Sequence, residues 1–149
     1  MADRFRCLDT SVVVKYLIDE EGSAEAMRLV TEAVLGDQNL IAPAWAWAEV
    51  GSVLRRRVHR GALTALDAAR LWRLYVDLPI VYLDDEAIRE RAWRIAATRE
   101  LDTGYDAAFL ACVEEVRSIG ARAELWTADR VFLRRLGPRR PAYVRELGA

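Results

Sequence analysis

The chain has 149 residues, a length that fits one domain and allows a hydrophobic core without disulfide or metal support. Hydrophobic residues make up 53% of it and charged residues 30%, which argues against an intrinsically disordered chain. The 22 basic and 23 acidic residues nearly cancel to a formal net charge of −1, so composition predicts no overall attraction to nucleic acid or to an anionic membrane. Any site for a polyanion must therefore be local.

Residue types and patterns exclude several other classes. No stretch approaches the roughly 20 apolar residues of a membrane span, and the first residues lack the apolar segment of a signal peptide, so we expect a cytoplasmic protein without a membrane partner. Cys7 and Cys112 form no CxxC motif and are expected to be buried and unbonded. His59 is the only histidine, which argues against zinc sites that need several, and its RRRVHR context predicts a solvated helix end. Carboxylates are the obvious working groups if the protein is an enzyme.

Strands and helices are predicted to alternate along the chain. Short apolar runs predict strands at 5–8, 39–42, 80–83 and 123–126, with a terminal strand at 141–147. Apolar spacing predicts helices at 12–18, 23–35, 45–59, 65–76, 84–96, 106–116 and 128–136. The helix at 106–116 is apolar on nearly every side and is expected to be deeply buried. The alternation predicts one α/β domain, residues 1–149, with a parallel sheet covered on both faces.

Four acids stand in apolar surroundings, where a carboxylate is costly unless it is paired, hydrogen-bonded or bound to a metal. They are Asp9, Glu49, Asp106 and Asp129. Three of them stand where a helix is predicted to begin, so a helix cap explains each aspartate about as well as a site does. Glu49 is predicted to lie inside its helix, where a cap does not explain it.

The predicted fold brings these acids together. Asp9 and Asp129 follow predicted strands, and ligands of open α/β sheets bind beyond the carboxyl ends of the strands. Glu49 and Asp106 lie near helix amino termini, which gather at the same edge. Two carboxylates about 4 Å apart repel by roughly 4 kcal/mol at an effective dielectric of 20, and a divalent cation relieves that repulsion. Oxygen ligands without histidine or thiolate favour Mg²⁺ or Mn²⁺ over zinc.

The ordered fragments LDTSVVVKYL, APAWAWAEVGSVLRRRV, GYDAAFLA and WTADRVF extend over nearly the whole chain. This set resembles the PIN-domain ribonucleases, specifically the VapC-like toxins of bacterial toxin–antitoxin pairs. The resemblance implies a three-layer α/β/α PIN-like domain with a central parallel sheet of four to five strands. It places the metal-binding acids at Asp9, Glu49, Asp106 and Asp129, with Thr10, Ser11 and Thr127 as polar supporters.

The activity implied by this resemblance is Mg²⁺-dependent endonucleolytic cleavage of RNA, in which a metal-activated water attacks the phosphodiester and leaves a 5′-phosphate and a 3′-hydroxyl. Asp9 is expected to be the central, bridging ligand of the metal, and Asp106 and Asp129 are expected to complete its ligand shell. Glu49 is expected to bind the metal or to orient the water. The resemblance also implies homodimerisation and a VapB-like antitoxin that fills a groove among the early helices. The FRCL strand before Asp9 is less apolar than in relatives, which predicts a shorter or more exposed edge. Asp102 is a further acid near Asp106, and we interpret it as a turn former outside the site.

Arg56 and Arg60 follow Glu49 along one helical stripe and are candidates to receive RNA phosphates, although a solvated basic helix end is the more usual explanation of such a charge run. The segment RRLGPRR is a second basic cluster with the same two interpretations. Trp72 and Trp93 are expected in the core. Trp45 and Trp47 cannot both point inward, because adjacent helical positions diverge by about 100°.

Other functions were weighed against the ribonuclease. An aspartyl phosphotransferase is disfavoured because Ser11 stands where the second acid of a DxD motif is expected. A phospho-receiver is disfavoured because the first strand is not followed by an acidic pair and Lys15, the only lysine, lies in the first helix. A non-catalytic RNA-binding or scaffold protein with the same fold is the alternative from a different class, and the intact set of acids argues against it.

Overall fold

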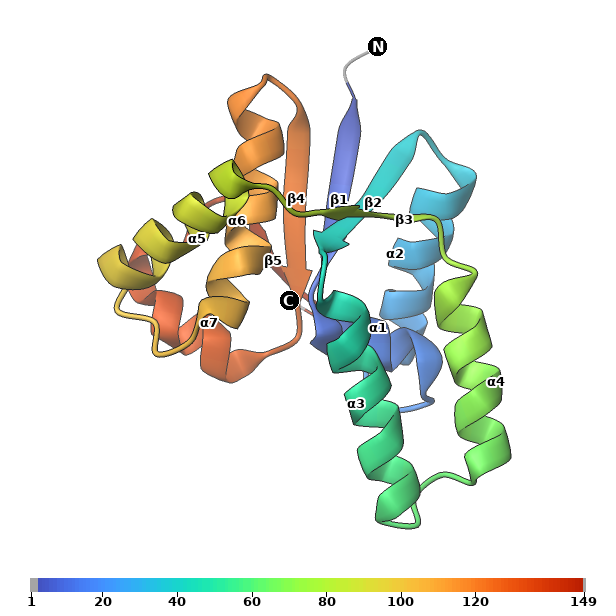
Figure 1. Ribbon diagram of the computed structural model, residues 1–149. Coiled ribbons are helices and arrows are strands. Elements are labelled where there is room, and N and C mark those ends of the chain that lie inside the picture. The colour runs from blue at the N-terminus through green and yellow to red at the C-terminus, as the bar shows by residue number, and fades with distance from the viewer. Residues whose placement is uncertain (1–2, 149) are drawn as a thin grey trace.

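The computed structural model describes residues 3–148 and shows one sheet with helices on both faces (Figure 1). The strands are β1 (Arg4–Leu8), β2 (Gln38–Pro43), β3 (Ile80–Leu83), β4 (Arg122–Thr127) and β5 (Val144–Glu146). The helices are α1 (Thr10–Leu17), α2 (Ser23–Leu35), α3 (Ala46–His59), α4 (Ala65–Val76), α5 (Glu86–Thr98), α6 (Gly104–Ser118), α7 (Arg130–Leu136) and the short 3-10 helix η1 (Gly137–Arg139).

All the strand pairs are parallel, in the order β3-β2-β1-β4-β5, which confirms the predicted parallel sheet. The amino-terminal strand β1 occupies the centre, between β2 and β4. Cys7 is fully buried there and Leu8 is nearly so. The expectation of greater exposure for the FRCL strand is therefore wrong, because a parallel sheet is covered by helices on both faces. The alternative of a shorter strand agrees with the five residues of β1 against six in β2 and in β4.

The helices divide into two layers that each bury one face of the sheet. Helices α1 and α2, with the inner parts of α3 and α4, pack on one face, and α5, α6 and α7 cover the other (Figure 1). The second layer is organised around α6, eight of whose residues are buried, as its apolar sequence predicts. Beyond the sheet, α3 and α4 project side by side as a helical hairpin (Figure 1).

Local capping explains where two of these helices begin. Thr64 accepts a hydrogen bond from the amide of Asp67 at 3.0 Å at the start of α4. Asp85 does the same for α5, accepting from the amide of Ile88 at 2.8 Å. A side-chain oxygen at this position satisfies one of the amides that the first turn leaves without a partner. Within the acidic segment 84–86, Asp85 is therefore the residue that caps the start of α5.

The tryptophans correct two expectations about the core. Trp93 has 74% of its surface exposed on α5, so its predicted core position is wrong, and Trp72 is only partly buried. Trp45 and Trp47 diverge as predicted: Trp45 packs edge-on against Phe109 at 5.4 Å, whereas Trp47 is 52% exposed. An amphipathic stripe is wide, and these rings lie at its margin, where the neighbouring layer does not reach.

The cysteines and the histidine lie as predicted. Cys7 and Cys112 are free and buried, and His59 ends α3 in an exposed position. Across residues 3–148, no helix combines the length and the hydropathy that crossing a lipid bilayer requires.

Candidate active site

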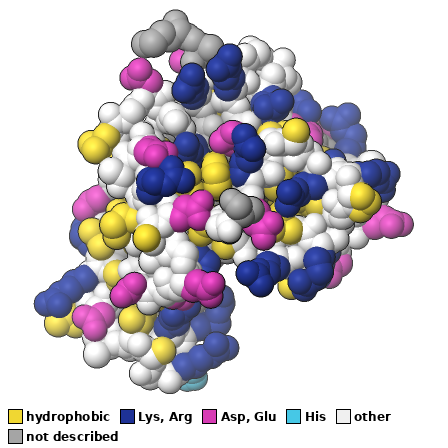
Figure 2. All heavy atoms as spheres, turned by 180° about the vertical axis from the view of Figure 1, so that it is seen from behind, with side chains coloured by type: hydrophobic (Ala, Val, Ile, Leu, Met, Phe, Trp, Pro, Cys, Tyr) yellow, Lys and Arg dark blue, Asp and Glu magenta, His cyan; other side chains and the backbone are white. Residues whose placement is uncertain are grey.

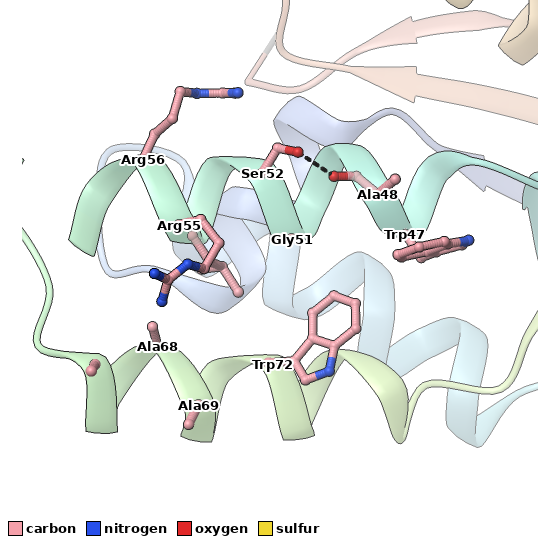
Figure 3. Close-up of a pocket in the computed structure, with 11 residues that line it drawn as sticks. Trp47, Ala48, Gly51, Ser52, Arg55, Arg56, Ala68, Ala69 and Trp72 are labelled. Atoms are coloured by element: carbon pink, nitrogen blue, oxygen red, sulfur yellow. Dashed lines mark hydrogen bonds between the residues drawn. The ribbon is translucent and has the colours of Figure 1, made fainter. Parts of the chain in front are cut away.

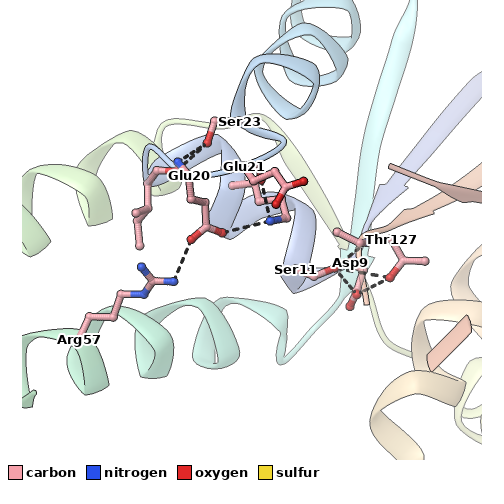
Figure 4. A network of polar contacts seen from close by, with 10 residues as sticks. Asp9, Ser11, Glu20, Glu21, Ser23, Arg57 and Thr127 are labelled. Carbon is pink, nitrogen blue, oxygen red and sulfur yellow. Dashed lines mark hydrogen bonds and ion pairs between the residues drawn. The ribbon is translucent and has the colours of Figure 1, made fainter. Parts of the chain in front are cut away.

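Asp9 is the buried acid at the centre of the sheet's carboxyl edge. It follows β1 directly, only 8% of its surface is exposed, and its amide donates to the carbonyl of Trp126 in β4 at 3.0 Å. Its side chain makes no cap bond to α1, so the cap interpretation is wrong for Asp9. Its Oδ2 instead accepts hydrogen bonds from Ser11 Oγ at 2.7 Å and from Thr127 Oγ1 at 2.8 Å (Figure 4).

These two hydroxyls tie the ends of β1 and β4 together. Thr127 is fully buried, and its Oγ1 accepts from the amide of Asp129 at 3.0 Å. Ser11 Oγ accepts from the amide of Ala128 at 2.9 Å. Burial raises the pKa of Asp9, the hydroxyls oppose that rise, and the negative charge of Asp129 adds to it. The carboxylate is thus held in one orientation in a place where its charge is costly.

Glu49 lies in the first turn of α3, nearer the helix start than the sequence predicts. A carboxylate there is favoured by the positive end of the helix dipole. Thr10 Oγ1 donates to Glu49 Oε1 at 2.5 Å, which links α1 to α3 beside Asp9. Burial raises the pKa of Glu49 and the charge of Asp9 raises it further, whereas Arg56 lowers it. The expected support from Thr10 therefore reaches Glu49, while Ser11 and Thr127 hold Asp9.

Asp106 is the acid whose protonation responds most to the other three. It lies in the first turn of α6, whose cap residue is Thr103, so the cap interpretation is wrong here as well. Burial raises the pKa of Asp106 to about 6, with further contributions from the negative charges of Asp9, Asp129 and Glu49. The cation of Arg135, 4.0 Å away, lowers it.

Asp129 does cap a helix, as one of the two interpretations of the sequence predicts. Its Oδ1 accepts from the amides of Val131 at 2.9 Å and Phe132 at 3.0 Å at the start of α7. The second carboxylate oxygen, Oδ2, is left for another partner. A capping role and a ligand role are therefore compatible in this residue.

The four carboxylates gather at one edge closely enough for negative charges among them to raise the pKa of Asp9, Glu49 and Asp106. Their hard oxygen atoms are chemically suited to Mg²⁺ or Mn²⁺. Among residues 3–148, however, no three His, Cys, Asp or Glu side chains are arranged so that they could hold a metal ion. The donor set fits the ion, and the assignment of the four acids as its ligands stays a prediction.

Arg135 is a residue of this edge that the sequence reasoning did not single out. Its Nη1 donates to Asp102 Oδ1 at 2.7 Å and its Nη2 to Asp102 Oδ2 at 3.3 Å, a two-pronged pair between α7 and the loop before α6. The same guanidinium reaches Asp106. Asp102 therefore does more than form a turn, since it holds the guanidinium of Arg135 beside Asp106. The sequence shows only that Arg135 belongs to a basic cluster.

Arg56 lies on the exposed flank of α3 that leads away from Glu49. Ser52 and Arg56 point to the side opposite α4, as their predicted common stripe requires (Figure 3). Arg56 is near enough to lower the pKa of Glu49. Arg60 follows the last turn of the helix and is exposed. On the neighbouring face of α3, Val50 and Leu54 are buried, whereas Trp47 is not.

A groove of about 720 Å³ separates α3 from α4. Trp47 and Trp72 line it from opposite helices, and Arg55 reaches across it toward Ala68 and Ala69 (Figure 3). The two helices approach closely at Gly51, where an added Cβ would lie 3.3 Å from the Trp72 ring. We call this the α3–α4 groove.

The family model of the PIN domain matches residues 6–136, and the chain belongs to the PIN domain family. Its fold is similar to the crystal structure of PAE2754 from Pyrobaculum aerophilum, with a TM-score of 0.64 and 20% identity over 99% of this chain and 92% of that one. It is also similar to VapBC2 from Rickettsia felis bound to a DNA fragment from their promoter, with a TM-score of 0.63 and 11% identity over 95% of this chain and 98% of that one. No curated protein matches the chain.

Proposed function

We propose that the chain is a Mg²⁺- or Mn²⁺-dependent endoribonuclease of the VapC-like toxin kind, acting on RNA in the cytoplasm and neutralised by a cognate VapB-like antitoxin. The observation that carries the proposal is the gathering of four acids at one sheet edge, namely Asp9, Glu49, Asp106 and Asp129. Negative charges among them help to raise the pKa of Asp9, Glu49 and Asp106. Membership of the PIN domain family supports the same conclusion. Acids concentrated at a cost to stability are typical of a functional site.

In this proposal the chain's own residues supply orientation and charge. Ser11 and Thr127 hold Asp9 Oδ2, which directs the rest of that carboxylate toward the edge. Asp9, Asp106 and the Oδ2 of Asp129 would hold the cation, and Glu49 would bind it or orient a water. The cation, when bound, supplies a water of lowered pKa and neutralises charge on the phosphoryl oxygens.

Arg56 is placed to receive an RNA phosphate beside this edge. It lies two turns after Glu49 on the exposed side of α3 (Figure 3), and Arg60 is the exposed residue that follows the last turn of the helix. Charge reversal at both positions is expected to weaken RNA binding and to reduce its dependence on salt. Unchanged affinity and salt dependence would assign both arginines to the solvated surface.

RNA cleavage with Mg²⁺, with EDTA and by Asp9→Asn tests the activity. We expect cleavage with Mg²⁺ and a loss of roughly a thousand-fold in either of the other conditions, because several kcal/mol of charge stabilisation is removed. Asp77→Asn is the matched control, since Asp77 is an exposed acid at the end of α4. Undiminished cleavage in EDTA or by Asp9→Asn would sink the proposal.

For the antitoxin we propose the α3–α4 groove. Its two tryptophans and its alanines offer apolar surface to a helix or arm, and the groove lies on the helix that carries Glu49, so an occupant is close to the acidic edge. VapBC2, a protein of similar fold, was crystallised with a DNA fragment from its promoter. Ala69→Glu, within the groove, is expected to abolish capture of a co-expressed antitoxin without reducing cleavage, whereas Ala97→Glu on the exposed side of α5 should leave capture intact.

We also propose a homodimer. Trp93 and Tyr105, 74% and 58% exposed, lie beside a cavity of about 580 Å³ between α5 and the start of α6, and burying them in a second copy would remove this apolar surface from water. Light scattering of the purified chain is expected to give twice the 16.9 kDa monomer mass, and Trp93→Glu the monomer mass. A monomeric wild type would contradict this part of the proposal.

A non-catalytic RNA-binding or scaffold protein is the second candidate. The observation in its favour is that, within the described chain, no three metal-binding side chains lie together. Calorimetric titration with Mn²⁺ separates the two, because the nuclease must bind the ion and the scaffold need not. Absence of Mn²⁺ binding together with RNA binding would favour the scaffold.

A further inference from the structure

The amino ends of the three central strands place basic side chains side by side, far from the acidic edge. Arg4 on β1 is matched with Gln38 on β2 and with Arg122 on β4. Matched residues of parallel strands direct their side chains to the same face, and neighbouring strands lie only about 4.8 Å apart. Two arginines and a glutamine therefore form one row across the sheet.

A second row lies one step further into the sheet. Arg6, two residues after Arg4, points to the same face and is only 6% exposed. Its Nη1 donates to the carbonyl of Leu29 in α2 at 2.8 Å, while its buried Nε has no hydrogen-bond partner among the described residues. A buried donor without an acceptor is costly, so this side chain retains an unused binding capacity.

The two rows border a cavity of about 430 Å³, and Arg117 at the end of α6 closes another side of it. Arg117 is fixed in place, because it donates to the carbonyl of Ala123 at 3.2 Å and stacks on the Tyr143 ring at 5.3 Å. Figure 2 shows several dark blue basic side chains at the top of the molecule. We call Arg4, Arg6, Arg117, Arg122 and Gln38 the arginine edge.

The carboxylates near the arginine edge are already engaged. Glu32 lies 3.6 Å from Arg6 but pairs more closely with Arg28, at 2.6 Å. Glu124, the one acid that lines the cavity, accepts from Trp126 Nε1 at 3.1 Å and from Arg145 Nε at 3.3 Å. Within residues 3–148, no carboxylate forms an ion pair with the arginines in the outer row or with the one on α6. Like charges on neighbouring strands destabilise a sheet, so the outer row of Arg4 and Arg122 favours an anion, whereas Arg6 in the second row is matched with Glu124.

We propose that the arginine edge is a binding site for a phosphoryl oxyanion. The planar guanidinium presents paired donors that match phosphate oxygens, and its hydrogen bonds to an ionised acceptor are strong. The Gln38 amide adds a neutral donor in the same row. The phosphoryl group belongs either to a nucleic-acid backbone or to a free phosphate or small phosphate ester.

The arginine edge is separate from the candidate nuclease site. Arg4 and Asp9 stand at opposite ends of β1, five residues apart, which corresponds to about 16 Å of extended chain. Anion binding at the arginine edge needs neither a divalent cation nor the four acids. The proposal therefore stands or falls independently of the proposed nuclease activity.

The double variant Arg4→Gln/Arg122→Gln tests the site, because both side chains are exposed and the fold does not depend on them. Arg70→Gln/Arg94→Gln removes the same charge from exposed positions on α4 and α5 and is the matched control. Inorganic phosphate, titrated calorimetrically in EDTA, is expected to bind the wild type and the control. Binding to the double variant should be about a hundred-fold weaker, since each lost charged hydrogen bond accounts for about ten-fold.

A second arm uses a short single-stranded RNA in EDTA, where cleavage is not expected. If the ligand is a nucleic-acid backbone, the double variant weakens RNA binding and reduces the dependence of log K on log salt by about 0.7 for each lost contact. If RNA binding is unchanged and phosphate binding is lost, the ligand is a free phosphate or small ester. The proposal is overturned if phosphate does not bind the wild type, or if the control loses binding as much as the double variant does.

Discussion

The two ends of the central strands differ in the sign of the charge that they collect. At the carboxyl edge, Asp9, Glu49, Asp106 and Asp129 come together from four segments, and at the amino edge Arg4 and Arg122 stand side by side. The net charge of −1 therefore conceals two opposite concentrations of like charge on one sheet. Each edge carries repulsion that a ligand of opposite charge relieves.

The edges also differ in how the protein tolerates this repulsion. Asp9 is buried and is stabilised by hydroxyl donors, whereas Arg4 and Arg122 are exposed and stabilised by water. Charge interactions strengthen with burial and are screened by salt at the surface. Substitutions should therefore have larger effects at the carboxyl edge than at the amino edge.

After Asp9→Asn, the largest effect is expected from Asp106→Asn. If Asp106 holds a cation, cleavage of RNA by Asp106→Asn should fall by roughly a hundred-fold in steady-state assays. Asp77→Asn, with its exposed side chain, should keep full activity. Equal activity of the two variants would remove Asp106 from the site and would break the contrast between the edges.

The same variant should gain stability, which a merely structural acid would not show. The pKa of Asp106 is raised to about 6 in the fold, so the stability that its protonated form contributes is complete below its ordinary pKa near 3.8 and is lost as pH rises through about 6. In metal-free buffer at pH 7.5, the free energy of unfolding of Asp106→Asn should be about 1–2 kcal/mol larger than that of the wild type. The difference should shrink toward pH 4, and a difference independent of pH would contradict the charge argument.

Thr127→Val should have the next largest effect. The fully buried hydroxyl donates to Asp9 and accepts from the Asp129 amide, so its loss removes one of the two hydroxyl donors to Asp9 and the side-chain acceptor of that amide. We expect a loss of about 1–3 kcal/mol in the free energy of unfolding, measured by urea titration, and about ten-fold slower cleavage. Thr127→Ser keeps the hydroxyl and is the control. A valine variant as stable and active as the serine variant would show that the hydroxyl does not position Asp9.

Arg135→Gln should change the site more mildly. Removing this cation raises the pKa of Asp106 further, because Arg135 is the group that lowers it. The Asp106 carboxyl resonance, followed by ¹³C NMR without metal, should titrate about half a pH unit higher. Arg134→Gln, the neighbouring exposed position on α7, should leave the titration in place.

The smallest effect is expected at the amino edge. Without phosphate and at low salt, Arg4→Gln/Arg122→Gln should stabilise the fold by about 0.5 kcal/mol, because it removes like charges from neighbouring strands. The gain should vanish at high salt. Arg70→Gln/Arg94→Gln, which breaks ion pairs to Asp67 and Glu90, should instead lose a little stability in thermal melts. A gain that persists at high salt would point to a cause other than repulsion.

Much of the fold could be predicted because its signals are local. The helix predicted at 23–35 matches α2, the strand predicted at 80–83 matches β3, and the apolar run at 106–116 lies within the buried α6. The exposure of Trp93 could not be predicted, since the sequence shows a helical stripe but not how far the neighbouring layer extends. The central place of β1 was likewise hidden by the arginine in FRCL.

The candidate site was predictable as a set of residues but not as an arrangement. Asp9 and Asp129 follow strands, so their meeting at one edge follows from the parallel sheet. The cap role proved right for Asp129 and wrong for Asp106, because α6 begins two residues before Asp106. It proved wrong for Asp9 as well, which stands at the cap position of α1 but whose carboxylate is held by Ser11 and Thr127. The link from Asp102 through Arg135 to Asp106 joins α7 to a distant loop and leaves no sequence pattern.

The sequence by itself therefore determined the alternation of strands and helices, the identity of the acids and the resemblance to the PIN-domain ribonucleases, since each rests on spacing within short segments. Only the tertiary structure decided that Arg4 and Arg122 are neighbours, that Arg6 is buried, and that hydroxyls from β4 and α1 hold Asp9. The physical reason is that strand pairing joins residues far apart in the chain, so the register of the sheet sets which charges meet.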